Sequence, residues 1–375
     1  MSRILFLVSS MQGGGAERVA ALLCNHWTAQ GHKVTLMPTF SGRGECLYPL
    51  DERVHLDYLA DRVGSCSSSV FNKLRRYRAL RGAIRELAPD IILSFLPHVN
   101  VAAVLAACGL KVPVVVSERI FPPAMPLSWS LEMLRRLTYP HAKGVVVQTE
   151  RARRWLADCC IKATGWVIPN PTVFPLPEGM PSLSPDSVVN SETRVAIGVG
   201  RLDQQKGFDQ LLTAFSVLAQ QFPDWDLVIL GEGMQREQLE VHRDELGLVG
   251  RVHLPGRVGN LADWYTRADM FVMSSRFEGF PNTLLEAMAH GLPAVSFDCE
   301  TGPADIIREG VDGYLVPPSE GAAGMACAMK YLMEHGDRRL RMSEAAIAVR
   351  DRFSPRRIMA QWDKVLGLDK IQVDV

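Results

Sequence analysis

Short, continuous runs of apolar residues alternate with segments of helical periodicity along the chain, and this alternation occurs twice. Continuous apolar runs are typical of strands buried on both faces of a parallel sheet, and the helical segments between them are then its crossovers. A stretch rich in Pro and Ser, 169–193, separates the two series and is interpreted as a linker. The sequence therefore predicts an α/β protein with two doubly wound domains.

The predicted boundaries follow the two series. A chain of 375 residues exceeds one ordinary core, and two domains of roughly 150–200 residues each are expected. We predict a Rossmann-like domain at 1–170, a second at 171–353 facing it across a cleft, and a C-terminal helix within 354–375 that returns to the first. The predicted strands are 3–9, 33–37, 90–95, 112–117 and 144–148 in the first domain, and 194–200, 226–230, 251–254, 269–274 and 293–298 in the second.

Charge is divided unevenly between the halves, although the formal net charge is zero. Residues 1–170 contain 21 Lys and Arg against 12 Asp and Glu, whereas the rest of the chain contains 20 against 29. The excess of cations suggests that the first half faces an anionic surface, and a chance difference between two lobes is the alternative. No nucleic-acid partner is expected.

Cysteine usage and hydropathy favour a cytoplasmic protein. Eight cysteines without a Cys-x-x-Cys pair are typical of reduced thiols, not of a disulfide framework or a zinc site. The N-terminus runs directly into a strand pattern and shows no signal-peptide cleavage site. The longest apolar run, 99–110, falls short of the ~18 residues that a membrane span requires.

The first motif is a glycine-rich turn after the first predicted strand, Gly13-Gly14-Gly15-Ala16-Glu17. Glycines there allow a backbone to approach a ligand, and the helix N-terminus that follows favours anions. The turn is not a dinucleotide fingerprint, because Arg18 stands where the third glycine is needed and no acidic residue ends the second strand. An NAD enzyme is therefore disfavoured, and a simple strand–helix turn remains the structural alternative.

The other two motifs lie in the second domain. Arg201 and Lys206 stand on the loop after its first strand, where two cations suit a diphosphate. The segment 278–287 reads Glu-Gly-Phe-Pro-Asn-Thr-Leu-Leu-Glu-Ala, with Pro281 as an early helical position and Gly291 as the helix end. Glu278 and Glu286 can then address one ligand at a helix N-terminus, unless they are merely solvated.

Together these motifs resemble glycosyltransferase family four, whose fold is GT-B. The resemblance covers nearly the whole chain. It rests on the Gly13 to Glu17 turn, on Gly200-Arg201-Leu202 with Lys206-Gly207, and on the Glu-x7-Glu element from Glu278 to Glu286, all in the family's order. It implies an enzyme that transfers a sugar from a nucleotide diphosphate donor, here a UDP-sugar, with retention of anomeric configuration and without a metal or other cofactor.

The resemblance also implies residue roles. Arg201 and Lys206 would bind the donor diphosphate, Glu286 the ribose, and Glu278 would lie by the transferred sugar. The backbone amides of the segment around Asn282 would contact that sugar and the phosphate. The residues involved in donor binding are then Gly13, Gly14, Gly15, Glu17, Arg257, Val258, Phe280, Pro281, Asn282, Thr283, Leu284 and Glu286, with the base stacking near Arg257 and Val258.

A metal is not required by this arrangement. Breaking the sugar–phosphate bond builds negative charge on the diphosphate, and each well-placed donor stabilises it by roughly 3–4 kcal/mol. Asp224-Trp225-Asp226 matches the Asp-x-Asp of metal-dependent transferases, but it follows Pro223 at a loop-to-strand boundary and is interpreted as a turn.

A basic helix at 73–85 suggests where an acceptor is held. Its predicted membrane-facing stripe consists of Arg75, Arg78, Arg81 and Arg85, and the pairs Arg135-Arg136 and Arg153-Arg154 extend it. Basic amphipathic helices suit anionic membrane surfaces, although such a helix can also pack on a sheet with its charges in water. We expect a peripheral protein on the inner face of the cytoplasmic membrane.

Finer resemblance points to the acceptor. Ser117-Glu118-Arg119 and Gly302-Pro303 look like bacterial transferases that extend undecaprenyl-diphosphate-linked oligosaccharides. This resemblance implies N-acetylgalactosamine or galactose as the transferred sugar and a polyprenyl-diphosphate-linked glycan as acceptor. His98 and Glu118 are candidate acceptor-side catalytic residues. A sugar-nucleotide epimerase of the same fold and a catalytically silent binding protein are the alternatives.

Overall fold

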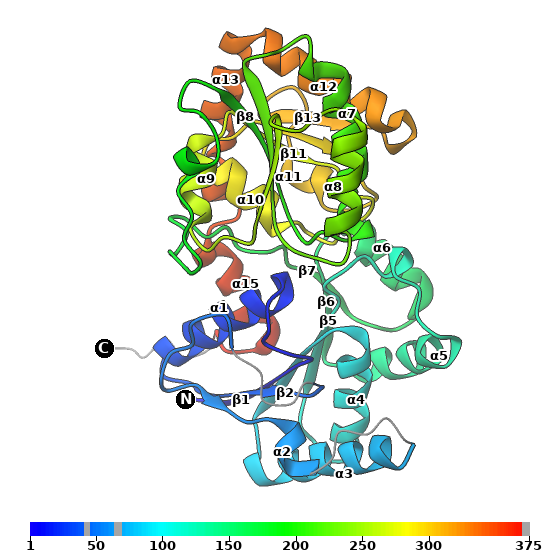
Figure 1. Ribbon diagram of the computed structural model, residues 1–375. Coiled ribbons are helices and arrows are strands. Elements are labelled where there is room, and N and C mark those ends of the chain that lie inside the picture. Colours follow the sequence, from blue (N-terminus) through cyan, green and yellow to red (C-terminus); the bar gives the residue numbers. More distant parts are fainter. Residues whose placement is uncertain (41–45, 64–69, 370–375) are drawn as a thin grey trace. The chain divides into compact units, whose positions relative to one another are not determined.

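The computed structural model describes residues 1–40, 46–63 and 70–369 (Figure 1). The chain divides into two compact units, and each is described by itself. Unit 1 comprises Met1–Pro171 with Arg356–Val375, and unit 2 comprises Thr172–Pro355. Both units are built around parallel sheets, so the α/β prediction with two Rossmann-like domains is confirmed.

Unit 1 contains a seven-stranded sheet in the order β3-β2-β1-β4-β5-β6-β7, with every adjacent pair parallel. Its strands are β1 (Arg3–Val8), β2 (Lys33–Pro38), β3 (His55–Leu56), β4 (Ile91–Phe95), β5 (Val114–Ser117), β6 (Gly144–Val147) and β7 (Gly165–Val167). Strands β1, β4, β5 and β6 are buried almost throughout, which is why they read as continuous apolar runs.

Helices cover both faces of this sheet. One core cluster joins the sheet to α1 and α15, and the other joins it to α2–α6. The helices are α1 (Gly15–Ala29), α2 (Leu59–Val63), α3 (Val70–Leu87), α4 (Pro97–Ala107), α5 (Trp129–Thr138), α6 (Glu150–Cys159) and α15 (Pro355–Leu366), with 3₁₀ turns η1 (Pro122–Ala124) and η2 (Tyr139–His141). The C-terminal helix α15 is held by Trp362 in the core and by Asp363, which accepts a hydrogen bond from Trp27 Nε1 at 2.8 Å.

Unit 2 contains a six-stranded parallel sheet in the order β10-β9-β8-β11-β12-β13. Its strands are β8 (Arg194–Val199), β9 (Trp225–Leu230), β10 (Val252–Gly256), β11 (Met270–Met273), β12 (Ala294–Phe297) and β13 (Gly313–Val316). Its helices are α7 (Phe208–Ala219), α8 (Arg236–Glu245), α9 (Leu261–Arg267), α10 (Asn282–Ala289), α11 (Pro303–Ile306), α12 (Gly321–Glu334), α13 (Gly336–Ala346) and α14 (Val349–Arg352), with η3 (Pro185–Ser187), η4 (Gln204–Lys206) and η5 (Pro318–Glu320).

The strand order reverses at one point in each sheet. In unit 1 the chain leaves β1 for one edge and returns beside it as β4, and in unit 2 it does the same at β8 and β11. Ligands of open parallel sheets bind outside the carboxyl ends of the strands at such a reversal. The topology therefore predicts ligand binding at the loops after β1 and β4 in unit 1, and at the loops after β8 and β11 in unit 2.

The Pro-rich stretch 169–193 is not a free linker, and that interpretation is corrected. Leu176 and Val189 are buried in the core of unit 2. Asn260 fixes Leu183, donating to its carbonyl and accepting from its N–H at 3.0 Å each. Prolines remove backbone donors, so this extended segment is held by side chains that pack and bond to it and not by a sheet.

Candidate functional site

The loop after β8 brings two cations to the reversal point of unit 2. Lys206 ends the short turn η4, and Gly207 follows it with a left-handed φ of 61°. A Cβ atom at Gly207 would lie 2.2 Å from the carbonyl oxygen of Ser274, so only glycine allows this approach to the loop after β11. Ser274 Oγ donates to the Lys206 carbonyl at 2.9 Å and fastens the two loops together.

Lys206 and Glu278 form an ion pair at this junction. Lys206 Nζ lies 2.6 Å from Glu278 Oε1, and the two side chains are 15% and 8% exposed. Ser275 Oγ donates to the same carboxylate oxygen at 2.7 Å, and Thr301 Oγ1 donates to the Glu278 carbonyl at 2.6 Å. The residues predicted to bind the diphosphate and the sugar, 72 positions apart in sequence, are therefore in direct contact.

Arg201 has a different environment from Lys206. Its side chain is 69% exposed and lies 3.3 Å from Asp203 Oδ2, and its Nη2 donates to Gln205 Oε1 at 3.3 Å. Gln205 Nε2 in turn donates to the Phe277 carbonyl at 3.0 Å, so the Arg201 loop and the Glu278 loop are linked a second time. The site thus combines a largely buried cation paired with Glu278 and an exposed cation beside Asp203.

Helix α10 begins beside this ion pair. Pro281 lies immediately before the first helical residue, one position earlier than predicted, and Gly291 follows the helix with φ of 83°. Glu286, one turn inside α10, is 3% exposed, and Tyr265 Oη donates to its Oε2 at 3.5 Å. The loop after β12 packs on the segment before the helix, where a Cβ atom at Gly302 would lie 2.8 Å from Pro281 Cδ.

Several residues predicted to bind the sugar donor have side chains that are buried in the core of unit 2. Phe280, Leu284 and Val258 belong to one buried cluster of unit 2, and the Phe280 ring contacts that of Phe353 at 5.3 Å. A ligand at these positions would meet their backbone. Arg257, which follows β10, is exposed, and Asn282 and Thr283 lie on the first turn of α10.

Sequence reasoning missed the residues that hold Glu278 in place. Ser275 is 1% exposed and Thr301 is 4% exposed, and both bond to Glu278 as described above. The signal available was their position: they follow β11 and β12, which are adjacent strands with their carboxyl ends at one edge.

The glycine turn of unit 1 follows β1 at the reversal point of that sheet. Gly13 has φ of 117°, and α1 starts at Gly15. Tyr48 Oη donates to the Gly14 carbonyl at 3.0 Å and accepts from its N–H at 3.2 Å. Glu17 accepts a hydrogen bond from Ser10 Oγ at 3.1 Å, which ties the first turn of the helix back to the strand end.

His98 lies on the other side of the same reversal point, in the first turn of α4. Leu96 before it has φ of 77°, which is unusual for a residue with a branched side chain. The imidazole contacts the Phe40 ring edge-on at 4.8 Å, and burial lowers the pKa of His98. A neutral imidazole at the carboxyl end of β4 can accept a proton.

Glu118 is part of a buried polar network. It is 4% exposed, accepts from Tyr139 Oη at 2.5 Å, and lies 3.5 Å from Arg135 Nη1, whose side chain is also 4% exposed. Tyr139 Oη also accepts from Asn100 Nδ2 at 3.0 Å. Burial raises the pKa of Glu118, while Arg135 opposes that shift. These contacts hold the carboxylate in the interior of unit 1, and its role as an acceptor-side base stays a prediction.

Neighbouring Arg119 is also buried. It is 7% exposed, its guanidinium lies 4.6 Å over the Phe95 ring, and its Nη2 donates to Asn170. Burial lowers the pKa of Arg119 to about 9. This arginine therefore anchors the last residues of unit 1 before the chain enters unit 2.

The basic stripe of α3 is less uniform than predicted. Arg75, Arg78 and Arg85 are exposed. Arg81 instead caps α4, donating from Nη1 to the carbonyls of Ala106 and Cys108 at 2.7 Å each. The extension through Arg135 is wrong, because Arg135 is 3% exposed and is engaged by Glu118 and Glu132.

Among the residues that the structure describes, no group of three or more His, Cys, Asp or Glu side chains lies close enough together to hold a metal ion. Asp226, in the Asp-x-Asp match, accepts from Arg251 Nε and pairs with His253 Nε2, each at 3.0 Å. Both of its carboxylate oxygens are thus used to hold β9 and β10 together.

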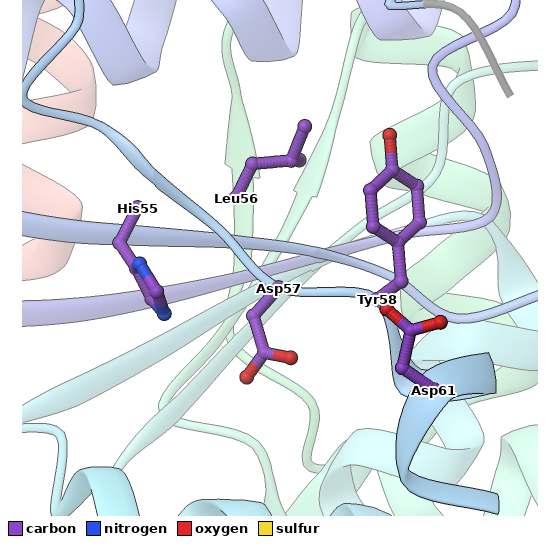
Figure 2. Close-up of a pocket in the computed structure, with 5 residues that line it drawn as sticks. All are labelled: His55, Leu56, Asp57, Tyr58 and Asp61. Atoms are coloured by element: carbon purple, nitrogen blue, oxygen red, sulfur yellow. The ribbon is translucent and has the colours of Figure 1, made fainter. Parts of the chain in front are cut away.

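A cavity in unit 1 lies at the edge strand β3 (Figure 2). His55 and Asp57 point to one side of the chain there, and Leu56 and Tyr58 to the other. Arg62 bridges Asp57 and Glu86 at 2.7 Å each. None of the predicted site residues lines this cavity.

Among the described helices none is long and apolar enough to cross a bilayer.

Two family models match the chain. The model described as Glycosyltransferase Family 4 matches residues 13–172, and the model described as Glycosyl transferases group 1 matches residues 180–349. The first match contains the glycine turn and His98, and the second contains Arg201, Lys206, Glu278 and Glu286.

Individual proteins are also similar. An exopolysaccharide phosphotransferase of Streptomyces coelicolor is 30% identical over 97% of this chain, which spans only 40% of that protein's length. The GalNAc-α-(1→4)-GalNAc-α-(1→3)-diNAcBac-PP-undecaprenol α-1,4-N-acetyl-D-galactosaminyltransferase of Campylobacter jejuni is 29% identical over 84% of this chain and 85% of its own. The structure of Anabaena HepE in complex with UDP superposes with a TM-score of 0.79 at 19% identity, covering 98% of this chain and 100% of that one.

Proposed function

Because the chain belongs to the group 1 and family 4 glycosyltransferases and has their GT-B fold, we propose that it moves a sugar from a UDP-sugar to a lipid-linked oligosaccharide, with retention and without a metal. The observation that carries this proposal is the contact between Lys206 and Glu278 next to the start of α10, with Arg201 on the same loop. Lys206 contacts the carboxylate that we assign to the sugar, and Arg201 lies on the same loop.

The reaction needs the positive charge of this site. The bond between the anomeric carbon and the diphosphate oxygen breaks, and the electron pair leaves with UDP. The acceptor hydroxyl oxygen forms the new bond and loses its proton. Arg201 and Lys206 stabilise the charge that develops on the leaving diphosphate, and each contributes roughly 3–4 kcal/mol if well placed. The N–H groups at the start of α10 add to this field.

The remaining donor contacts follow the same geometry. Glu286 binds the ribose hydroxyls, Glu278 lies by the transferred sugar, and the backbone around Asn282 contacts its hydroxyls. Arg257 and the backbone of Val258 flank the base. His98 accepts the acceptor's proton.

The identity of donor and acceptor is proposed from the relatives. The Campylobacter relative is named for adding N-acetylgalactosamine to an undecaprenyl-diphosphate-linked glycan, and HepE binds UDP. We therefore assign UDP-N-acetylgalactosamine or UDP-galactose as donor and a polyprenyl-diphosphate-linked glycan of a bacterial surface polysaccharide as acceptor. We propose that unit 1, with its excess of cations, works at the inner face of the cytoplasmic membrane.

The proposal is tested by presenting the purified chain with UDP-sugars and a polyprenyl-diphosphate-linked oligosaccharide. We expect UDP release that requires the acceptor, and a product whose new linkage has the donor's anomeric configuration by NMR. The Lys206→Ala variant serves as the inactive control. Interconversion of UDP-sugars without acceptor would indicate an epimerase, and binding of UDP-sugar with no turnover of any donor would indicate a silent binding protein.

A further inference from the structure

Helix α5 of unit 1 turns most of its apolar side chains to solvent. The side chains of Trp129, Met133 and Leu137 recur every four residues along one face and are 77%, 43% and 59% exposed. Met125, in the loop before the helix, is 54% exposed. Residues four apart lie on the same face of a helix, so these side chains form one continuous ridge, the α5 ridge.

The opposite side of α5 faces the protein and carries polar residues together with the partly buried Leu131. Arg135 and Thr138 are the buried positions of the helix. Arg135 is engaged by Glu118, and its guanidinium lies 4.6 Å over the Trp155 ring of α6. This buried ion pair fixes the rotation of α5 about its own axis. Because Arg135 must face inwards, the α5 ridge must face outwards.

A helix of an ordinary water-soluble domain turns its apolar stripe to the core. An outward ridge that contains a tryptophan at one end therefore indicates an interaction surface. Three features favour a lipid surface over a protein partner. Tryptophan is the residue enriched at membrane–water interfaces, where its apolar body and polar N–H are both satisfied. The other ridge residues are flexible or aliphatic and present no polar group to a partner.

The charge around the ridge is the third feature. Arg136 on α5 is exposed and paired with Glu132 at 3.0 Å. Arg153 and Arg154 are exposed on α6, which packs against α5 through Trp155, and Arg153 is paired with Glu150 at 2.7 Å. Through residue 170 the chain carries 21 Lys and Arg against 12 Asp and Glu. An excess of cations around the apolar α5 ridge complements anionic lipid headgroups.

We infer that the α5 ridge inserts into the headgroup region of an anionic bilayer and is the element that docks unit 1. This inference rests on the proposed lipid-linked acceptor for its purpose, but the surface itself is independent of the donor site. The exposed arginines of α3, Arg75, Arg78 and Arg85, then add electrostatic attraction to a contact that the α5 ridge makes hydrophobic.

The test uses vesicles of phosphatidylcholine with phosphatidylglycerol and the whole chain, without donor or acceptor. The parent protein should float with these vesicles, and a fraction should remain bound at high salt. Changing Trp129, Met133 and Leu137 together to Ser should weaken binding by at least about tenfold. The matched control changes three exposed apolar residues of unit 2, Val217, Met234 and Val241, to Ser and should bind like the parent.

A spectroscopic measurement checks insertion directly. On addition of vesicles the tryptophan emission should shift to shorter wavelength, and Trp129→Phe should abolish the shift while retaining binding. Trp27, Trp225, Trp264 and Trp362 are fully buried and should contribute little to it.

Three results would overturn the inference. They are no vesicle binding by the parent, equal binding by the ridge variant, and a self-associated parent that the ridge variant converts to monomers. UDP release with a short-chain, water-soluble acceptor separates this inference from the proposed function. We expect the ridge variant to retain that activity. A parent that binds vesicles through the α5 ridge but transfers no sugar would refute only the proposed function.

Discussion

The change Glu278→Gln tests the donor site most sharply. It removes one negative charge 2.6 Å from Lys206 Nζ while leaving a side-chain oxygen that can still accept from Ser275. The shape of the site is kept, so the variant separates the charge of Glu278 from its volume. Glu286→Gln is the matched partner on the neighbouring helix.

The magnitude follows from the number of donors on Lys206. An ammonium carries three N–H groups, so the one directed to Glu278 leaves two for a phosphate. The Gln oxygen can still accept from Lys206, but the loss of the carboxylate charge weakens this contact and unmasks the positive charge of Lys206. We expect UDP to bind Glu278→Gln as tightly as the parent or up to about tenfold more tightly, which corresponds to ~1.4 kcal/mol. Turnover should nevertheless fall by ~10²-fold, because the carboxylate no longer faces the positive charge that develops on the sugar.

Glu286→Gln should behave in the opposite way. Hydrogen bonds to a charged group are worth about 1.5–3 kcal/mol, so losing the ribose contact should weaken UDP by ~10–100-fold. Calorimetric titration with UDP measures both variants, steady-state UDP release measures turnover, and thermal unfolding shows whether each remains folded. If both changes weaken UDP equally while both proteins stay folded, the assignment of separate roles to the two glutamates is wrong.

The remaining predictions concern the cations, the metal and the acceptor side. Arg201→Ala and Lys206→Ala should each lower turnover by ~10²-fold in UDP-release assays, and near-normal turnover in both would refute the diphosphate clamp. Arg201→Ala should leave the unfolding temperature unchanged, because its side chain is 69% exposed. Activity should persist in excess chelator, whereas complete loss with EDTA that manganese restores would show that a metal stabilises the leaving group. Burial lowers the pKa of His98, so the rate should decline only as the pH falls below the usual range for His, where the ring becomes protonated and cannot accept a proton. A pH–rate profile that His98→Gln leaves unchanged would exclude this role.

The central strands could be predicted from the sequence, but three edge strands could not. Strands such as β4 and β11 are buried at every position, so their apolar runs are continuous. The strands β3, β7 and β13 were missed. Each has two to four residues and lies at an edge of its sheet, where only one neighbour must be paired and fewer side chains must be apolar.

The site could be placed from strand ends and helix starts, but its internal contacts could not. The positions of Arg201, Lys206 and Glu278 on loops after strands follow from local pattern. The contact between Lys206 and Glu278 depends on the order β8-β11 in the sheet, which brings residues 72 positions apart into hydrogen-bonding distance. The same limit explains Arg81 and Glu118. Their residue types suggested surface and catalytic roles but did not predict their partners, which are the carbonyls at the end of α4 for Arg81 and Arg135 for Glu118.

Helix α5 shows why pattern alone does not give orientation. Its apolar positions repeat at helical spacing, and the ordinary interpretation of such a stripe is that it packs on the core. The fold places Glu118 beneath the helix, where it accepts from Tyr139, the residue that follows α5, and a buried carboxylate without a cationic partner would be costly. Arg135 supplies that partner and thereby turns the apolar stripe outwards. The exposed hydrophobic surface on unit 1 thus lies opposite the face of α5 that carries the buried Arg135.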